Sequence, residues 1–168
     1  IFRALAQFMG TMVSANSKYD KYMRNEPGNN MTASEMNGLQ IFRTHCAGCH
    51  AEPLFTDFSF RNNGLTPTTV NDSGRAHITL KSEDLYTFKV PSLRNLKYTP
   101  PYMHDGRLNT LEEVLDHYAS GINTNMPNLD PRLTNGILLT PQERTDLIAF
   151  LNTLNDETFI QDARFHQP

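Results

Sequence analysis

The stretch HCAGCHAEP, residues 45–53, contains both cysteines of this 168-residue chain. Two residues separate Cys46 from Cys49, and His50 follows the second cysteine directly. Cysteines at this spacing can carry a covalently attached haem, share a zinc ion or form a disulfide. Each outcome implies a different class of protein, so the surrounding sequence has to discriminate among them.

The pattern C-x-x-C-H is the attachment pattern of haem c. Each thiol adds across one vinyl group of the haem, and the adjacent histidine is then held under the iron as its proximal ligand. A zinc site usually needs a second Cys or His pair at matching spacing, and the chain has no further cysteine. A redox-active pair would favour a βαβ context, and a lone disulfide would leave His50 unexplained. We therefore predict one covalent haem c on Cys46, Cys49 and His50.

Bulk properties exclude other classes of protein. At 168 residues the chain fits one domain, or one domain with an appendage. Hydrophobic residues make up 38% of the chain and charged residues 20%, which is enough for an ordinary core. The net charge of −3 gives no basic surface for nucleic acid. No apolar run of membrane-spanning length occurs, and no signal peptide is recognised.

The chain opens abruptly with IFRALAQFMGTMV, which reads as the middle of a helix, so we expect a truncated chain. Haem c is attached outside the cytoplasm, which predicts a periplasmic location.

Apolar periodicity predicts a mainly α fold with long ordered loops. Together with the C-x-x-C-H pattern, this arrangement resembles a class I cytochrome c-like haem domain. Residues 1–14 carry a helical stripe, and capping boxes open three further helices, at Thr32–Glu35, Thr110–Glu113 and Thr140–Glu143. We expect Gly38 to allow close approach to Phe150 of the last helix. The predicted division is an N-terminal helix and connection carried over from the interdomain region (1–30), the haem domain (31–160) and a tail (161–168).

The long irregular segment 51–81 is rich in Gly, Asn, Thr, Pro and Ser, with at most short strands around DFSFRN. A loop of this length in a compact domain is usually functional or wraps a bound group. We expect haem to be the centre on which this segment packs.

Several separate motifs together resemble the bacterial di-haem cytochrome c peroxidase family, including its MauG-type branch. They are LFTDFSFRNNGL (54–65), FKVPSLRNLKYTPPYMHDGR (88–107), TLEEVLDHYASG (110–121), NLDPRL (128–133) and LTPQERTDLIAFLNTL (139–154). The resemblance runs from SANSKYDKY (14–22) to about Leu154, with the motifs in the family's order. It implies the C-terminal haem domain, with the N-terminal haem domain absent from this sequence.

The sixth ligand of the iron decides between electron transfer and other chemistry. From the residues alone, Met126, Met103, His104 and Tyr118 are candidates, whereas His117 should point away on its helix. We interpret Met31, Met36 and the N-terminal methionines as core residues. In the peroxidase branch a methionine stands eight residues after the threonine that opens the TLEE helix. Here Tyr118 occupies that place, which resembles the His–Tyr ligation of the MauG-type branch. We therefore predict His50 and Tyr118 as iron ligands, with Met126 or Met103 as alternatives.

The resemblance also implies roles for four other residues. His104 is expected near the haem edge and propionates, or as a loop histidine bonded to backbone. Arg94 is expected to pair with a propionate, or to form an ordinary ion pair with an acidic side chain. Main-chain oxygens of Thr99 and Pro101 would share a calcium ion with an asparagine of the missing domain. Three aspartates are expected to cap turns instead of carrying chemistry: Asp57, Asp105 and Asp130.

The function implied is that of a di-haem cytochrome c peroxidase-like oxidoreductase. This chain would relay electrons to a peroxide-reacting haem in the absent N-terminal domain. A small electron-donor protein or a protein substrate would supply electrons from outside, and a homodimer is conceivable. The alternative is a stand-alone mono-haem c-type electron carrier, which the single C-x-x-C-H favours.

Overall fold

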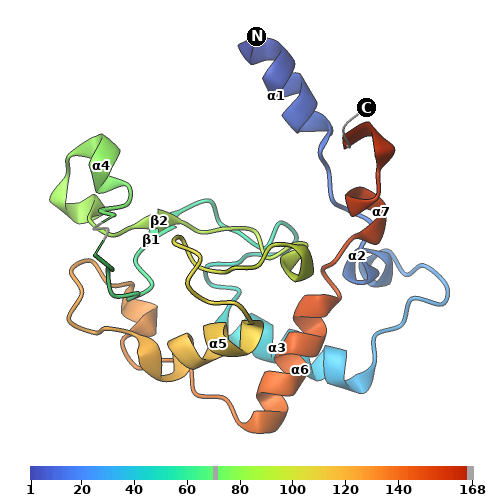
Figure 1. Cartoon of the computed structure of the whole chain (residues 1–168). Helices are drawn as coiled ribbons and strands as arrows, with labels where there is room; N and C mark the ends of the chain where they lie inside the picture. Colours follow the sequence, from blue (N-terminus) through green and yellow to red (C-terminus); the bar gives the residue numbers. More distant parts are fainter. Residues whose placement is uncertain (70–71, 166–168) are drawn as a thin grey trace.

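The computed structural model describes residues 1–69 and 72–165 and is mainly helical, with long loops (Figure 1). The helices are α1 (Phe2–Thr11), α2 (Lys18–Met23), α3 (Ala33–His45), α4 (Ala76–Thr79), α5 (Leu111–Asp116), α6 (Pro141–Asn152) and α7 (Glu157–Ile160). Strands β1 (Phe60–Arg61) and β2 (Phe88–Lys89) pair antiparallel. Single 3-10 turns lie at Ser82–Asp84, Leu96–Tyr98, Pro131–Leu133 and Ala163–Phe165. The predicted mainly α fold with long ordered loops is confirmed.

Each predicted capping box is formed. Thr32, Thr110 and Thr140 accept from the backbone N–H three residues on, and the glutamate there reaches back. A fourth box, Ser17 with Asp20, opens α2. Sequence reasoning missed it because aspartate replaces the usual glutamate or glutamine. These local bonds set where the helices begin.

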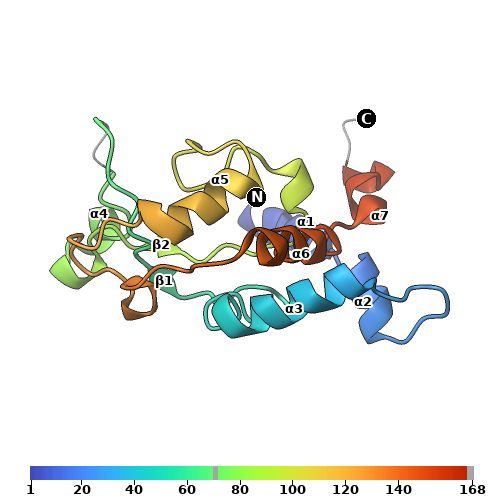
Figure 2. The same ribbon diagram turned by 90° about the horizontal axis from the view of Figure 1, so that it is seen from below.

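Helices α3 and α6 cross at Gly38. A Cβ atom there would lie 1.9 Å from the carbonyl oxygen of Asp146 and 2.7 Å from Cβ of Phe150. Only glycine permits so close an approach of the two backbones, and the predicted contact of Gly38 with Phe150 is confirmed. Figure 2 shows the two helices crossing side by side, with α5 on the other side of α6 from α3.

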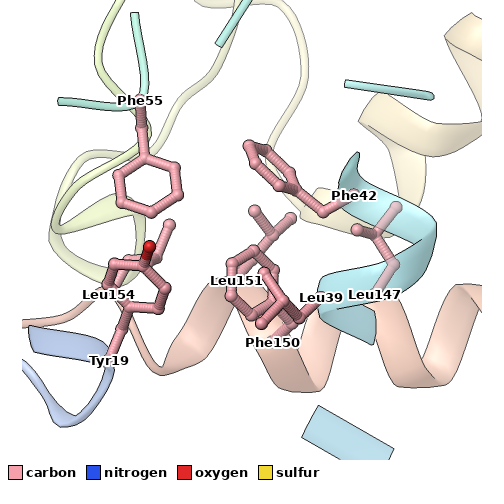
Figure 3. Packing of buried hydrophobic residues seen from close by; sticks show 8 residues of the cluster. All are labelled: Tyr19, Leu39, Phe42, Phe55, Leu147, Phe150, Leu151 and Leu154. Carbon is pink, nitrogen blue, oxygen red and sulfur yellow. The ribbon is translucent and has the colours of Figure 1, made fainter. Parts of the chain in front are cut away.

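The core lies on this crossing (Figure 3). Phe42 of α3 packs on Phe150 of α6 with ring centroids 5.1 Å apart, and Phe55 joins them from the loop. Tyr19 of α2 packs edge-on against Phe55. The cluster consists of Tyr19, Leu39, Phe42, Phe55, Leu147, Phe150, Leu151 and Leu154. Helix α2 therefore packs on the same core as the segment predicted to be the haem domain.

Helix α1 projects away from this core (Figure 1). Met9 is 62% and Met12 40% exposed, so their interpretation as core residues is wrong within this chain. The apolar stripe is present, and one of its members, Phe8, makes a ring contact with Phe165 near the C-terminus. Met31, by contrast, packs against the core as expected. The domain division stays a prediction, and residues 166–168 of the predicted tail lie outside the described residues.

Candidate haem site

A cavity of about 440 Å³ lies beside the α3–α6 crossing. Its volume falls within the range of cofactor sites, and most of its lining is apolar. Leu147 and Leu151 of α6 form part of its wall, and the segment 88–104 contributes another part. Three of the predicted haem ligands and attachment points come from the end of α3, and a fourth from the end of α5: Cys46, Cys49, His50 and Tyr118.

His50 is held by its Nδ1 atom. The carbonyl oxygens of Phe55 and Pro91 both lie 3.1 Å from Nδ1. Two carbonyl acceptors require a proton on Nδ1, which leaves Nε2 unprotonated and available to a metal. Burial lowers the pKa of His50, against the raising effect of these two bonds. The imidazole is therefore neutral, oriented and part of the cavity wall.

Both cysteines are free thiols at the same wall. Burial, with a smaller contribution from Cys49, raises the pKa of Cys46 to about 12, and burial also raises that of Cys49. Thiols rather than thiolates therefore predominate near neutral pH in the chain without a bound group. Among the described residues, no three His, Cys, Asp or Glu side chains gather as a metal-binding group.

Tyr118 lies where α5 changes its winding. After Asp116 the helix continues as a π-helical turn, His117–Gly121, of a kind frequent at functional sites. Tyr118 lines the cavity, and burial raises its pKa although a side-chain hydrogen bond with Asn63 opposes the shift. His117 turns away as predicted, and its Nε2 lies 3.0 Å from the carbonyl oxygen of Asn63.

The two alternative distal ligands differ in position. Met103 lines the cavity, whereas Met126 is not among the described residues of its wall. His104 also lines the cavity and stacks on Phe88, with ring centroids 3.8 Å apart. Thr99 and Pro101, the predicted calcium ligands, lie in the same wall. The structure therefore brings Tyr118, Met103 and His104 to one site and leaves Met126 outside.

Arg94 forms an ion pair with an acidic side chain, which was the alternative to its predicted contact with a haem propionate. Its guanidinium bonds Asp20 at 2.7 and 2.8 Å and also donates to the carbonyl oxygen of Pro53. In the described part of the chain it does not belong to the cavity lining. The propionate contact expected for Arg94 is therefore not supported, because Asp20, 74 residues away in sequence, occupies its fork.

Sequence reasoning missed another arginine, Arg61, at the cavity wall. It bonds Asp57 at 2.7 Å and Asp130 at 2.6 Å. The two aspartates also cap turns as predicted: Asp57 accepts from the N–H of Ser59, and Asp130 from that of Arg132. Asp105 likewise accepts from Arg107. In the sequence, the place of Arg61 in the segment DFSFRN gave the available signal.

The donor set fits a covalent haem. Two free thiols, an imidazole with an available Nε2 and a phenol border one apolar cavity whose remaining wall can exclude water. Imidazole and phenolate are both known axial ligands of haem iron.

No helix in the described ranges is long and apolar enough to cross a membrane.

The cytochrome c family model matches residues 35–155. Methylamine utilization protein MauG of Methylorubrum extorquens is 39% identical over 158 residues, covering 92% of this chain and 43% of the relative. Cytochrome c peroxidase Ccp of Escherichia coli is 32% identical, covering 90% of this chain and 31% of the relative. The chain thus spans less than half the length of these curated relatives.

Solved structures agree with these relatives. The crystal structure of a MauG-like protein associated with microbial copper homeostasis matches with a TM-score of 0.78 and 34% identity, over 92% of this chain and 52% of that chain. The di-haem peroxidase BthA of Burkholderia thailandensis matches with a TM-score of 0.68 over 86% of this chain and 47% of that chain; at 22% identity this shows the fold alone. The chain therefore belongs to the cytochrome c family, among the haem domains of MauG and the di-haem cytochrome c peroxidases.

Proposed function

We propose that this chain is the C-terminal haem domain of a periplasmic di-haem oxidoreductase, with one haem c held by Cys46, Cys49, His50 and Tyr118. The observation that carries the proposal is the orientation of His50. Its Nδ1 is bonded to two backbone carbonyls, so Nε2 is left for a metal in a cavity that both cysteine thiols also line.

Each residue makes a separate contribution. The Cys46 and Cys49 thiols would hold the cofactor through thioethers to its two vinyl groups. His50 supplies a neutral imidazole, and Tyr118 supplies an oxygen from the end of α5. When bound, the haem contributes one-electron chemistry at its iron. Leu147 and Leu151 keep water from that site.

In the whole protein the domain would pass electrons to a second haem, which reacts with hydrogen peroxide. The length of the relatives supports this proposal, because each has room for a further domain. A small redox protein or a protein substrate would provide the electrons. The Thr99 and Pro101 carbonyls would bind calcium together with that domain. The names of the relatives, which include a cytochrome c peroxidase and a di-haem peroxidase, support the second haem and the peroxide.

The test of ligation is an optical and EPR spectrum of the haem-loaded protein and of Tyr118→Phe. We expect a c-type pyridine haemochrome, covalent haem in the intact mass, and a tyrosinate charge-transfer band that disappears in the variant. An unchanged band in Tyr118→Phe would exclude Tyr118 as ligand. The matched control is Tyr22→Phe in α2, outside the cavity lining, which should retain the wild-type spectrum.

A second candidate is a mono-haem electron carrier with His–Met ligation. The observation in its favour is Met103, whose thioether lines the same cavity. A sulfur-to-iron band in wild-type protein, lost in Met103→Leu, together with easy reduction, would support this candidate. A thioether ligand raises the reduction potential, whereas a phenolate lowers it.

A further inference from the structure

The side chain of Asn63 lies between the two possible distal ligands. Its Nδ2 donates to Sδ of Met103 at 3.4 Å, and hydrogen bonding from the same side chain opposes the rise in the pKa of Tyr118. All three residues line the cavity. One amide therefore lies at the same cavity wall as both the proposed distal ligand and its alternative.

The orientation of this amide is set by other bonds. Oδ1 of Asn63 accepts from the backbone N–H of Leu65 at 3.3 Å. The backbone carbonyl of Asn63 accepts from Nε2 of His117 at 3.0 Å, which ties the residue to the π-helical turn. Because Oδ1 faces a donor, Nδ2 and its two hydrogens face Met103 and Tyr118.

We infer that Asn63 selects the distal ligand, by favouring the Tyr118 oxygen and holding the Met103 sulfur off the iron. This inference rests on the proposed function, since it assumes a haem c on His50. An N–H donor stabilises a phenolate oxygen strongly, because hydrogen bonds to charged acceptors are the strong ones. A thioether is a weak acceptor, and an N–H bonded to its sulfur engages one of the two lone pairs and weakens the sulfur as a donor to a metal. Both effects favour Tyr118.

The signal lies in the sequence FRNNGL, where Asn63 is the second of two adjacent asparagines. Asn62 has a structural role, because it is 2% exposed, its Nδ2 donates to the carbonyl of Pro127, and its Oδ1 accepts from Gly64. Of the two, it is Asn63 that faces the cavity with donors. Asn62 therefore holds the loop in place, whereas Asn63 contacts the cavity.

The test uses haem-loaded Asn63→Asp. Aspartate keeps an oxygen for the N–H of Leu65 but loses both donors, and its charge opposes a neighbouring phenolate. We expect the ratio of Tyr118-ligated to Met103-ligated protein to fall by about tenfold or more, read from the two charge-transfer bands and ferric EPR. The reduction potential should rise accordingly. In Asn63→Asp with Met103→Leu, the sulfur band should be lost.

Asn123→Asp is the matched control. Asn123 makes the same kind of turn, with Oδ1 accepting from the N–H of Asn125 at 3.0 Å, but it does not line the cavity. Its spectrum should equal that of wild type. Asn63→Leu, which adds no charge, separates loss of the donors from electrostatic repulsion and should shift the ligand ratio in the same direction.

The outcomes separate this inference from the proposal on which it rests. A tyrosine-ligated wild type whose Asn63 variants keep the wild-type spectrum and potential would overturn the inference alone. Methionine ligation in wild type would overturn both, because Asn63 would then not hold Met103 off the iron. A tyrosine band in wild type that gives way to a sulfur band in both Asn63 variants is the result we expect.

Discussion

The α3–α6 crossing and the haem cavity share side chains but are filled in different ways. At the crossing, Leu39, Phe42 and Phe150 are at most 1% exposed and pack on one another. Beside it, Leu147 and Leu151 also line a cavity of about 440 Å³ that the chain does not fill. The first region is completed by the protein's own side chains, whereas the second needs a bound group. Stability and cofactor binding should therefore respond to different substitutions.

The largest effect is expected when the cofactor cannot attach. In Cys46→Ala with Cys49→Ala, we expect loss of covalent haem and loss of hydrogen-exchange protection in 88–107 and 110–121. α3 and α6 should stay protected, because their packing requires no haem. Hydrogen exchange with mass spectrometry on both proteins measures this. Protection lost evenly along the chain would show that the two regions are not separable.

Gly38→Ala should disrupt the crossing itself. The added methyl would overlap the Asp146 carbonyl, and the helices would have to separate, at a cost of about 3 kcal/mol or more in unfolding free energy. Denaturant unfolding measures this cost. Gly48→Ala is the matched control, because its Cβ would meet only Arg132 at an ordinary 3.5 Å. Equal stability of the two variants would contradict the steric argument.

Arg94→Met tests the ion pair that ties α2 to the haem domain. Both side chains are nearly buried, so an uncompensated Asp20 should cost about 3 kcal/mol at pH 7. Lys97→Met, whose bond to Glu157 is more than half exposed, should cost much less. Equal unfolding free energies for the two variants would show that the buried ion pair of Arg94 stabilises the fold no more than the exposed one of Lys97.

The pH dependence of that pair has a definite sign. Burial alone would raise the pKa of Asp20, but hydrogen bonds from Arg94 and Ser17 outweigh it and lower the pKa. A carboxyl whose pKa is lowered by folding stabilises the protein above its unfolded pKa of about 3.8, and this contribution is lost as pH falls through the folded value. The deficit of Arg94→Met should therefore shrink below about pH 4.

The smallest effects are expected at two helix caps: Thr140 of α6, at the crossing, and Thr110 of α5, beside the cavity. Thr140→Ala at the start of α6 should cost about 1 kcal/mol with or without haem. Thr110→Ala at the start of α5 should cost about as much in haem-loaded protein and less without haem, when α5 is held only by Leu111 and Leu115 against the core and by Arg144 of α6. Thermal unfolding of both variants in both states measures this difference. The same cost for Thr110→Ala in both states would contradict the distinction.

Predictions from sequence succeeded where the physics is local. A capping box depends on four consecutive residues, so Thr32, Thr110 and Thr140 could be assigned by inspection. The two attachment cysteines and the histidine lie within five residues, so one helix end brings them together. The partner of Arg94 could not be predicted in this way, because Asp20 is its neighbour only in space. The N-terminal stripe was correctly read as a helix, but periodicity cannot say whether a partner covers it.

The sequence by itself indicated the haem c attachment pattern and the starts of three helices, since each depends on residue type at short spacing, and the order of its motifs indicated the family. Only the tertiary structure decided which distant side chains meet at the cavity. It places Tyr118, Met103 and Asn63 there and leaves Arg94 and Met126 elsewhere. The reason is physical: residues far apart in the chain meet through the packing of α3, α5 and α6 and the loops between them, which no local pattern encodes.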